Sequence, residues 1–156
     1  MERTIVNLIL IALVLVAAYT DIRHGKIYNA LTLPAIVIGL GLNGIFGGSE
    51  GLIQSAGAAA VAFGLLIIPV ALRGVGAGDL KLMVAVGALL GGIQLLWLVF
   101  FYSALVLGAA AAVIVGCRYL ALIPLPISTA WKFAKLKSLP YAPGIALGCA
   151  AVLFVR

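Results

Sequence analysis

Two aspartates stand out in this chain because nearly everything around them is apolar. Asp21 and Asp79 are two of only four acidic residues among 156, and each borders a long uncharged stretch. An ionisable residue at or near membrane depth is costly, and its default interpretation is a functional site. Two carboxyl groups brought within a few ångströms cannot both ionise easily, so they share a proton. Such a pair could act as general acid and general base on a water molecule and a carbonyl group.

The residues before Asp79 are unusually rich in glycine. They read Gly76-Ala77-Gly78, and Lys81 follows two positions after the aspartate. Glycine permits backbone angles closed to other residues and lets another chain approach closely. An aspartate that caps a helix start is common, but a cap alone does not require these glycines. We therefore expect Asp79 to be functional, and Gly76 and Gly78 to shape its surroundings.

Asp21 gives a weaker signal than Asp79. It lies among the basic residues Arg23, His24 and Lys26, where an acid is most often an ordinary solvated side chain. Its functional interpretation depends on its being a partner of Asp79. If Asp79 begins a helix and Asp21 ends one, the helix dipoles favour a negative charge on Asp79 and disfavour it on Asp21. We then expect Asp79 to be the base and Asp21 to carry the proton.

The composition indicates what kind of elements must hold these residues. The chain is 65% hydrophobic and 9% charged, whereas a soluble domain has about a quarter charged residues. Most of its surface must therefore face lipid. Intrinsic disorder is excluded because it requires low hydrophobicity and high charge. The two cysteines, Cys117 and Cys149, form no C-x-x-C pair, so we expect packing residues and no metal site.

The uncharged stretches predict six transmembrane helices in a single all-α domain over residues 1–156. A helix needs about 20 residues to cross the hydrocarbon, with about 17 as the minimum. The stretch 82–117 is too long for one span but sufficient for two short ones that fold back at Gly91-Gly92. The expected spans are 4–20, 27–49, 51–72, the two within 82–117, and 138–155, which is opened by Pro140 and Pro143.

The basic residues predict the orientation. Connections 21–28, 73–81 and 117–137 hold eight of the ten Lys and Arg residues, and loops rich in these residues face the cytoplasm. Both termini are then outside, and the two aspartates lie at the cytoplasmic face. The aromatic and basic stretch 131–137 favours contact with membrane lipids. Despite the net charge of +6, no basic stripe with interleaved aromatics indicates nucleic acid as a partner.

Three segments together resemble a known family. The sequence Gly-Ala-Gly-Asp at 76–79 looks like the Gly-x-Gly-Asp signature of membrane aspartyl proteases. The stretch 21–29, Asp-Ile-Arg-His-Gly-Lys-Ile-Tyr-Asn, is similar to the first aspartate region of the type IV prepilin peptidases, with Tyr28 in place of a usual proline. Residues 140–144, Pro-Tyr-Ala-Pro-Gly, with Gly148 look like the proline-tyrosine segment that opens their last span.

The resemblance implies an activity and its residues. It implies a multi-pass endopeptidase of the bacterial or archaeal inner membrane that removes the short basic leader of prepilin-like proteins, cutting after a glycine. Asp21 and Asp79 would be catalytic, and Gly76, Gly78, Asn29 and Lys81 would bind substrate or shape the site. No metal or organic cofactor is needed. The loop at 21–28 has no room for the four-cysteine insertion of longer members, which implies a short, peptidase-only branch such as those serving tight-adherence (Flp) pili.

Two other functions are compatible with the same residues. A small ion or proton transporter, or a channel subunit, could use Asp21 and Asp79 as a cation path. It would need polar residues to continue through the membrane, and the outer halves of the spans offer only Asn43, Ser55 and Gln94. A structural subunit could bind partners through its small-residue faces, Gly39, Gly41, Gly44 and Gly48, although internal helix packing explains such a face more simply.

Overall fold

The fold is known from a computed structural model that describes residues 2–72, 75–119 and 142–155. These ranges are helical apart from short connections, and they contain no strand. The helices are α1 (Glu2–His24), α2 (Asn29–Ala71), α3 (Ala77–Leu90), α4 (Ile93–Tyr119) and α6 (Ala142–Val155). The all-α prediction is confirmed. The aromatic and basic stretch 131–137 and Pro140 lie outside the described residues.

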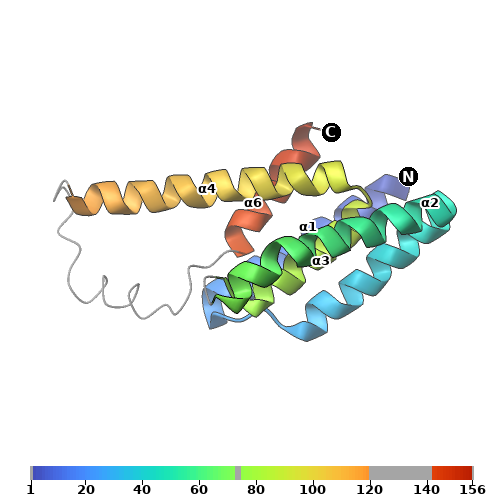
Figure 1. Ribbon diagram of the computed structural model, residues 1–156, viewed down its shortest axis with the longest axis horizontal. Helices are drawn as coiled ribbons and strands as arrows, with labels where there is room; N and C mark the ends of the chain where they lie inside the picture. Colours follow the sequence, from blue (N-terminus) through green and yellow to red (C-terminus); the bar gives the residue numbers. More distant parts are fainter. Residues whose placement is uncertain (1, 73–74, 120–141, 156) are drawn as a thin grey trace.

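Helix α2 is a pair of arms rather than one rod. Gly48 has φ 62° and ψ −151°, a non-helical backbone that interrupts the helix, and glycine adopts such angles without steric cost. The first arm, residues 29–47, and the second arm, residues 49–71, fold back on each other at this point (Figure 1). The sequence predicts a break between spans at Glu50, and the structure places the kink two residues earlier.

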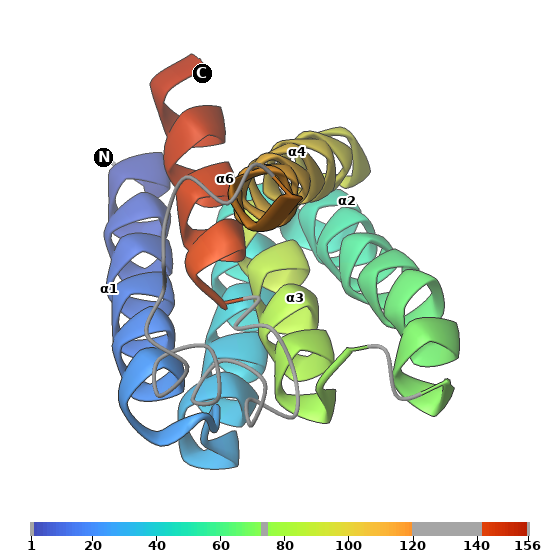
Figure 2. The same cartoon turned by 90° about the vertical axis from the view of Figure 1, so that its left-hand side faces the viewer.

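Helix α3 occupies the middle of the bundle. In Figure 2 it stands between α1 on one side and the second arm of α2 on the other. Its side chains are buried on all sides, with every residue from Ala85 to Leu90 inside the protein. A helix that is apolar all round is expected to be surrounded by others. Its most extensive contacts are with α2.

Glycines allow α3 and α2 to approach backbone to backbone. A Cβ placed on Gly39 of the first arm would lie 2.8 Å from the backbone of Ala88 and Leu89. A Cβ on Gly87 of α3 would lie 2.9 Å from the carbonyl oxygen of Ala58 on the second arm. Small residues permit this kind of close helix pairing in membranes. Gly39 therefore serves internal packing, as the simpler interpretation of the small-residue face expects.

Polar side chains from both arms of α2 hold the end of α3. Asn43 Nδ2 donates to the carbonyl oxygens of Ala88 at 2.9 Å and Leu89 at 3.2 Å, and Ser55 Oγ donates to that of Ala88 at 2.6 Å. The last carbonyls of a helix have no partner within it, so these bonds satisfy them. The helix ends at Gly91, whose φ of 64° is left-handed, and this confirms the predicted fold-back at 91–92.

Helix α6 lies between α1 and α4 (Figure 2). A Cβ on Gly148 would come within 2.8 Å of the carbonyl oxygen of Val99, so α6 and α4 also meet closely. Cys149, on the same helix, is buried and unpaired, as a packing residue should be. Helix α1 begins and α6 ends toward the same end of the bundle (Figure 1).

The exterior of the bundle is apolar. Large side chains such as Leu15, Val37 and Ile53 are more than half exposed, and soluble monomers rarely expose much contiguous apolar surface. Among the described residues, two helical segments, Thr4–His24 and Asn29–Ala71, are long and apolar enough to cross a membrane, and two shorter apolar ones are Ile93–Ala109 and Ala142–Leu153. Six crossings with both termini outside stay a prediction.

The packing of Gly39 can be tested against a glycine on the same arm. We expect Gly39→Ala to lower the thermal unfolding midpoint in detergent, because the added methyl group must displace the α3 backbone, which costs about 1–3 kcal/mol. Gly41→Ala is the control, since a Cβ there meets nothing within 4 Å and alanine has the higher helix propensity. Equal midpoints for the two variants would contradict the packing.

Candidate active site

Asp21 and Asp79 line one pocket of about 370 Å³. Helix α1 supplies Asp21, the start of α3 supplies Asp79, and the connection from α1 to α2 closes the pocket between them. The described lining residues are Asp21, Gly25, Lys26, Ile27, Tyr28, Asn29, Gly76, Ala77, Gly78 and Asp79. The structure thus brings together the two aspartates, Asn29 and both glycines that the sequence indicates.

Asp79 sits in the first turn of α3 and is only 6% exposed. The two glycines before it allow two separate close approaches. A Cβ on Gly76 would lie 2.9 Å from Oδ2 of Asp79, and a Cβ on Gly78 would lie 3.1 Å from the Cβ of Ile27. Gly76 therefore makes room for the carboxyl group, and Gly78 lets the α1–α2 connection pack against α3.

Asp21 lies in the last turn of α1 and is partly buried. The backbone of Ala142, the first residue of α6, lies near the carboxyl group of Asp21. Oδ2 of Asp21 and Oδ1 of Asp79 are both buried without a hydrogen-bond partner. Buried polar atoms are nearly always satisfied, and a catalytic role is one of the few explanations for those that are not.

The helix dipoles do not distinguish the two carboxyl groups as the sequence suggests. Asp79 does begin a helix and Asp21 does end one. However, Asp21 also lies at the first residue of α6, where the positive end of a second dipole favours negative charge. The expectation that Asp79 is the base and Asp21 the proton carrier stays a prediction, and the approach of α6 to Asp21 is a further influence on it that local sequence does not reveal.

Lys81 reaches the site through Asn29. Its Nζ donates a 2.9 Å hydrogen bond to Oδ1 of Asn29, the first residue of α2. Asn29 lines the pocket, whereas Lys81 does not belong to the described lining. The sequence groups these two residues as site-shaping, and the structure adds that they contact each other across two helix starts.

Gly25 and Ala142 are site residues that the sequence reasoning did not select. Gly25 ends α1 with a left-handed φ of 61°, and its N–H donates to the carbonyl of Asp21 at 2.7 Å. Glycine after a helix whose last turn is basic is a recognisable helix stop, so Gly25 could have been found. Ala142 contributes only its backbone, which leaves no signal in its residue type.

The arrangement provides acid–base chemistry. Two carboxyl groups that line one pocket can share a proton, and such a pair can accept a proton from water through one member while the other donates one to a carbonyl oxygen. Within the described residues, no three His, Cys, Asp or Glu side chains gather as metal ligands.

Comparison with known proteins identifies the family of this chain. Residues 8–113, which include both aspartates, match the model of the type IV leader peptidase family, and the chain belongs to that family. It is 32% identical over 145 residues to the prepilin leader peptidase/N-methyltransferase of Bacillus subtilis (strain 168), an alignment that covers 90% of this chain and 51% of the relative. The chain thus spans about half the length of that relative. No solved structure matches this chain.

The meeting of the two aspartates can be tested by cross-linking. In a background with Cys117→Ser and Cys149→Ala, we expect Asp21→Cys and Asp79→Cys together to be joined by a short bifunctional thiol reagent. Ile22→Cys with Asp79→Cys is the control, because Ile22 neighbours Asp21 but is 70% exposed. Peptide mass spectrometry identifies the link, and equal yields from the two pairs would refute the shared pocket.

Proposed function

We propose that this chain is a membrane-embedded aspartic endopeptidase that removes the short basic leader of type IV prepilin-like proteins, cutting after a glycine at the cytoplasmic membrane face. Asp21 and Asp79 are its catalytic residues. The observation that carries the proposal is that both aspartates line one pocket and each keeps a buried carboxyl oxygen without a partner. The family and the printed activity of the Bacillus subtilis relative support the same chemistry.

The reaction needs one charged and one protonated carboxyl group. The carboxylate takes a proton from a water molecule, whose oxygen attacks the carbonyl carbon of the scissile bond. The carboxylic acid donates its proton toward the carbonyl oxygen and stabilises the tetrahedral intermediate. When the carbon–nitrogen bond breaks, one carboxyl group gives its proton to the leaving amine and the other takes a proton from a hydroxyl group of the intermediate, which restores the shared-proton state.

The glycines provide room for the substrate backbone. A side chain on Gly76 would occupy the space beside the Asp79 carboxyl group, so its absence lets an extended peptide approach. A substrate glycine before the cut suits this crowded site because it adds no side chain of its own. Asn29 also lines the pocket and offers an amide to the peptide backbone.

The charge distribution supports the proposed placement in the membrane. The predicted connections at the aspartate end hold eight of the ten Lys and Arg residues, which favours the cytoplasmic side for that end. Two helices of sufficient length and the apolar exterior of the described bundle support a multi-pass protein of the inner membrane, with six crossings and both termini outside.

The short connection between α1 and α2 supports a peptidase-only branch. Helix α1 ends at His24 and α2 begins at Asn29, so residues 25–28 leave no room for a cytoplasmic insertion there. We propose that the chain belongs to the branch that serves tight-adherence (Flp) pili and that its substrate is a Flp-type prepilin.

The transporter alternative finds less support than the peptidase. Asn43 and Ser55 donate to carbonyl oxygens of α3 and so are engaged in holding the bundle together. Beyond Asp79, the buried side chains of α3 are apolar, including Leu82, Met83 and Val86. In the described part of the chain, no polar path continues from the aspartates along this central helix.

Replacement of either aspartate tests the proposed activity. We expect Asp21→Asn and Asp79→Asn each to reduce the cleavage rate of a Flp-type prepilin in detergent or liposomes by at least about 100-fold, because general acid–base catalysis contributes that much or more. Leader loss is followed on a gel, and unchanged unfolding midpoints show that the variants are folded.

Glu50→Gln is the matched control, since it removes one exposed acid at a distance from the pocket. Full cleavage by either aspartate variant would remove the catalytic pair. Proton flux into liposomes without any cleavage by the wild-type protein would favour the transporter.

The contact between Lys81 and Asn29 gives a separate prediction. Loss of a single hydrogen bond costs about 1 kcal/mol, so we expect Lys81→Met and Asn29→Ala each to lower kcat about fivefold. The double variant should be no slower than the slower single variant, because the two residues act through one contact. Multiplied losses in the double variant would show independent roles and contradict the positioning function of Lys81.

A further inference from the structure

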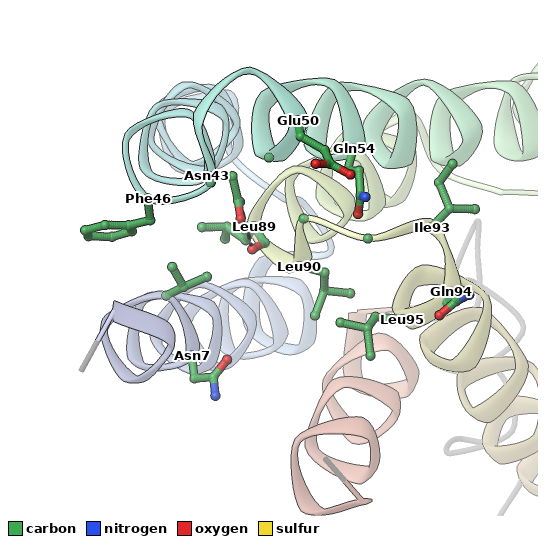
Figure 3. Close-up of a pocket in the computed structure, with 15 residues that line it drawn as sticks. Asn7, Asn43, Phe46, Glu50, Gln54, Leu89, Leu90, Ile93, Gln94 and Leu95 are labelled. Atoms are coloured by element: carbon green, nitrogen blue, oxygen red, sulfur yellow. Dashed lines mark hydrogen bonds between the residues drawn. The ribbon is translucent and has the colours of Figure 1, made fainter.

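A second and larger pocket lies at the end of the bundle opposite to the aspartates. It has a volume of about 740 Å³. It lies where α2 kinks, where α3 turns into α4, and beside the first turns of α1 (Figure 3). None of its described lining residues belongs to the aspartate pocket, so the proposed peptidase reaction gives it no role.

The polar groups of this pocket are concentrated in an otherwise apolar chain. Its polar side chains are Asn7, Asn43, Glu50, Gln54 and Gln94. Glu50 and Gln54 are one turn apart on the second arm of α2 and lie next to the link between α3 and α4 (Figure 3). Glu50 is the one charged residue in the described lining. The pocket therefore offers a carboxylate with the amide of Gln54 beside it (Figure 3) and, within that lining, no basic side chain.

The rest of the lining and its rim are apolar. Leu89, Leu90 and Leu95 line the pocket, and Phe46 and Ile93, which also line it, are each 41% exposed. Next to them on the exterior, large side chains of α2 are strongly exposed, with Ile45 at 76% and Ile53 at 70%. A pocket with polar and apolar walls that opens onto an apolar exterior suits an amphipathic ligand.

The first turn of α4 gives the pocket a second charge preference. Gly92, Ile93, Gln94 and Leu95 all line it, and the N–H of Leu96 bonds the carbonyl of Gly92 at 3.2 Å. The N–H groups before Leu96 have no acceptor within the helix, and they favour negative charge. The same cavity thus favours a cation at Glu50 and an anion at the start of α4.

We propose that this pocket binds the headgroup of a zwitterionic phospholipid with an ammonium group, of the phosphatidylethanolamine type. Glu50 accepts hydrogen bonds from the ammonium group, and the amides of Gln54 and Gln94 flank the headgroup. The phosphate lies toward the start of α4, and an acyl chain follows the apolar rim past Ile93, on that side of the pocket (Figure 3). The cavity and its single carboxylate carry the proposal, and the binding is independent of peptidase activity.

Native mass spectrometry of the full chain in detergent tests this site. The probes are phosphatidylethanolamine and phosphatidylglycerol with identical acyl chains, and glycerophosphoethanolamine, which has none. We expect phosphatidylethanolamine to bind about tenfold more tightly than phosphatidylglycerol, and Glu50→Gln to abolish that preference, because a charge-assisted hydrogen bond is lost. Equal binding of the two lipids, or a preference retained in Glu50→Gln, overturns the proposal. If glycerophosphoethanolamine binds as tightly as phosphatidylethanolamine, the acyl chains contribute nothing to binding, and the proposal of a lipid ligand is overturned.

A pair of glycine variants separates this pocket from the general lipid-facing surface. A Cβ on Gly47, which lines the pocket, or on Gly41, which does not, meets nothing within 4 Å. We expect Gly47→Leu to fill the pocket and lower phosphatidylethanolamine binding at least about tenfold, with Gly41→Leu unchanged. An equal effect of the two variants contradicts the site. The wild-type protein could instead form a dimer that carries no lipid and that dissociates in the Glu50→Gln variant. That result would identify the pocket as a contact between two copies and overturn the proposal.

Discussion

The close backbone packing of α3 against both arms of α2 is the constraint on which the other features depend. Gly39 and Gly87 allow it, and Asn43 and Ser55 fix its far end by satisfying carbonyl groups that would otherwise be buried without partners. With α3 held along its length, Asp79 at its start has little freedom. A pair of carboxyl groups that acts in catalysis must be held in a fixed geometry. The contacts that would fix Asp79 in this way include those at the opposite end of the same helix.

Three helix ends converge on the aspartate pocket. Helix α1 brings Asp21 in its last turn, α3 brings Asp79 in its first, and α6 contributes the backbone of Ala142. The hydrogen bond between Lys81 and Asn29 adds the start of α2 to this group. Each carboxyl group keeps one buried oxygen without a hydrogen-bond partner, so the site combines defined positions with unused hydrogen-bonding capacity.

The sequence predicted the helical fold and the meeting of the two aspartates in one pocket, and the strongest local signals were the uncharged runs and the glycines before Asp79. Long uncharged runs define the helices, and a Gly-x-Gly before an acid in an apolar chain is hard to explain by packing alone. The charge of Glu50 predicted the break in α2 two residues too late. The kink lies at Gly48, because glycine can adopt the non-helical backbone angles that it needs. The contact of α6 with Asp21 and the polar pocket around Glu50 arise from tertiary packing, which periodicity and spacing do not encode.

Helix α3 has 14 residues, so at 1.5 Å per residue it is about 21 Å long. The hydrocarbon core of a bilayer is about 30 Å thick. This central helix is shorter than the hydrocarbon core and is screened from lipid by its neighbours. The apolar layer is therefore thinner in the middle of the protein than in the surrounding bilayer. For the proposed peptidase, water would then have only a short distance to travel from the surface to the aspartates, and a peptide bond at the membrane edge could be hydrolysed without a continuous aqueous channel.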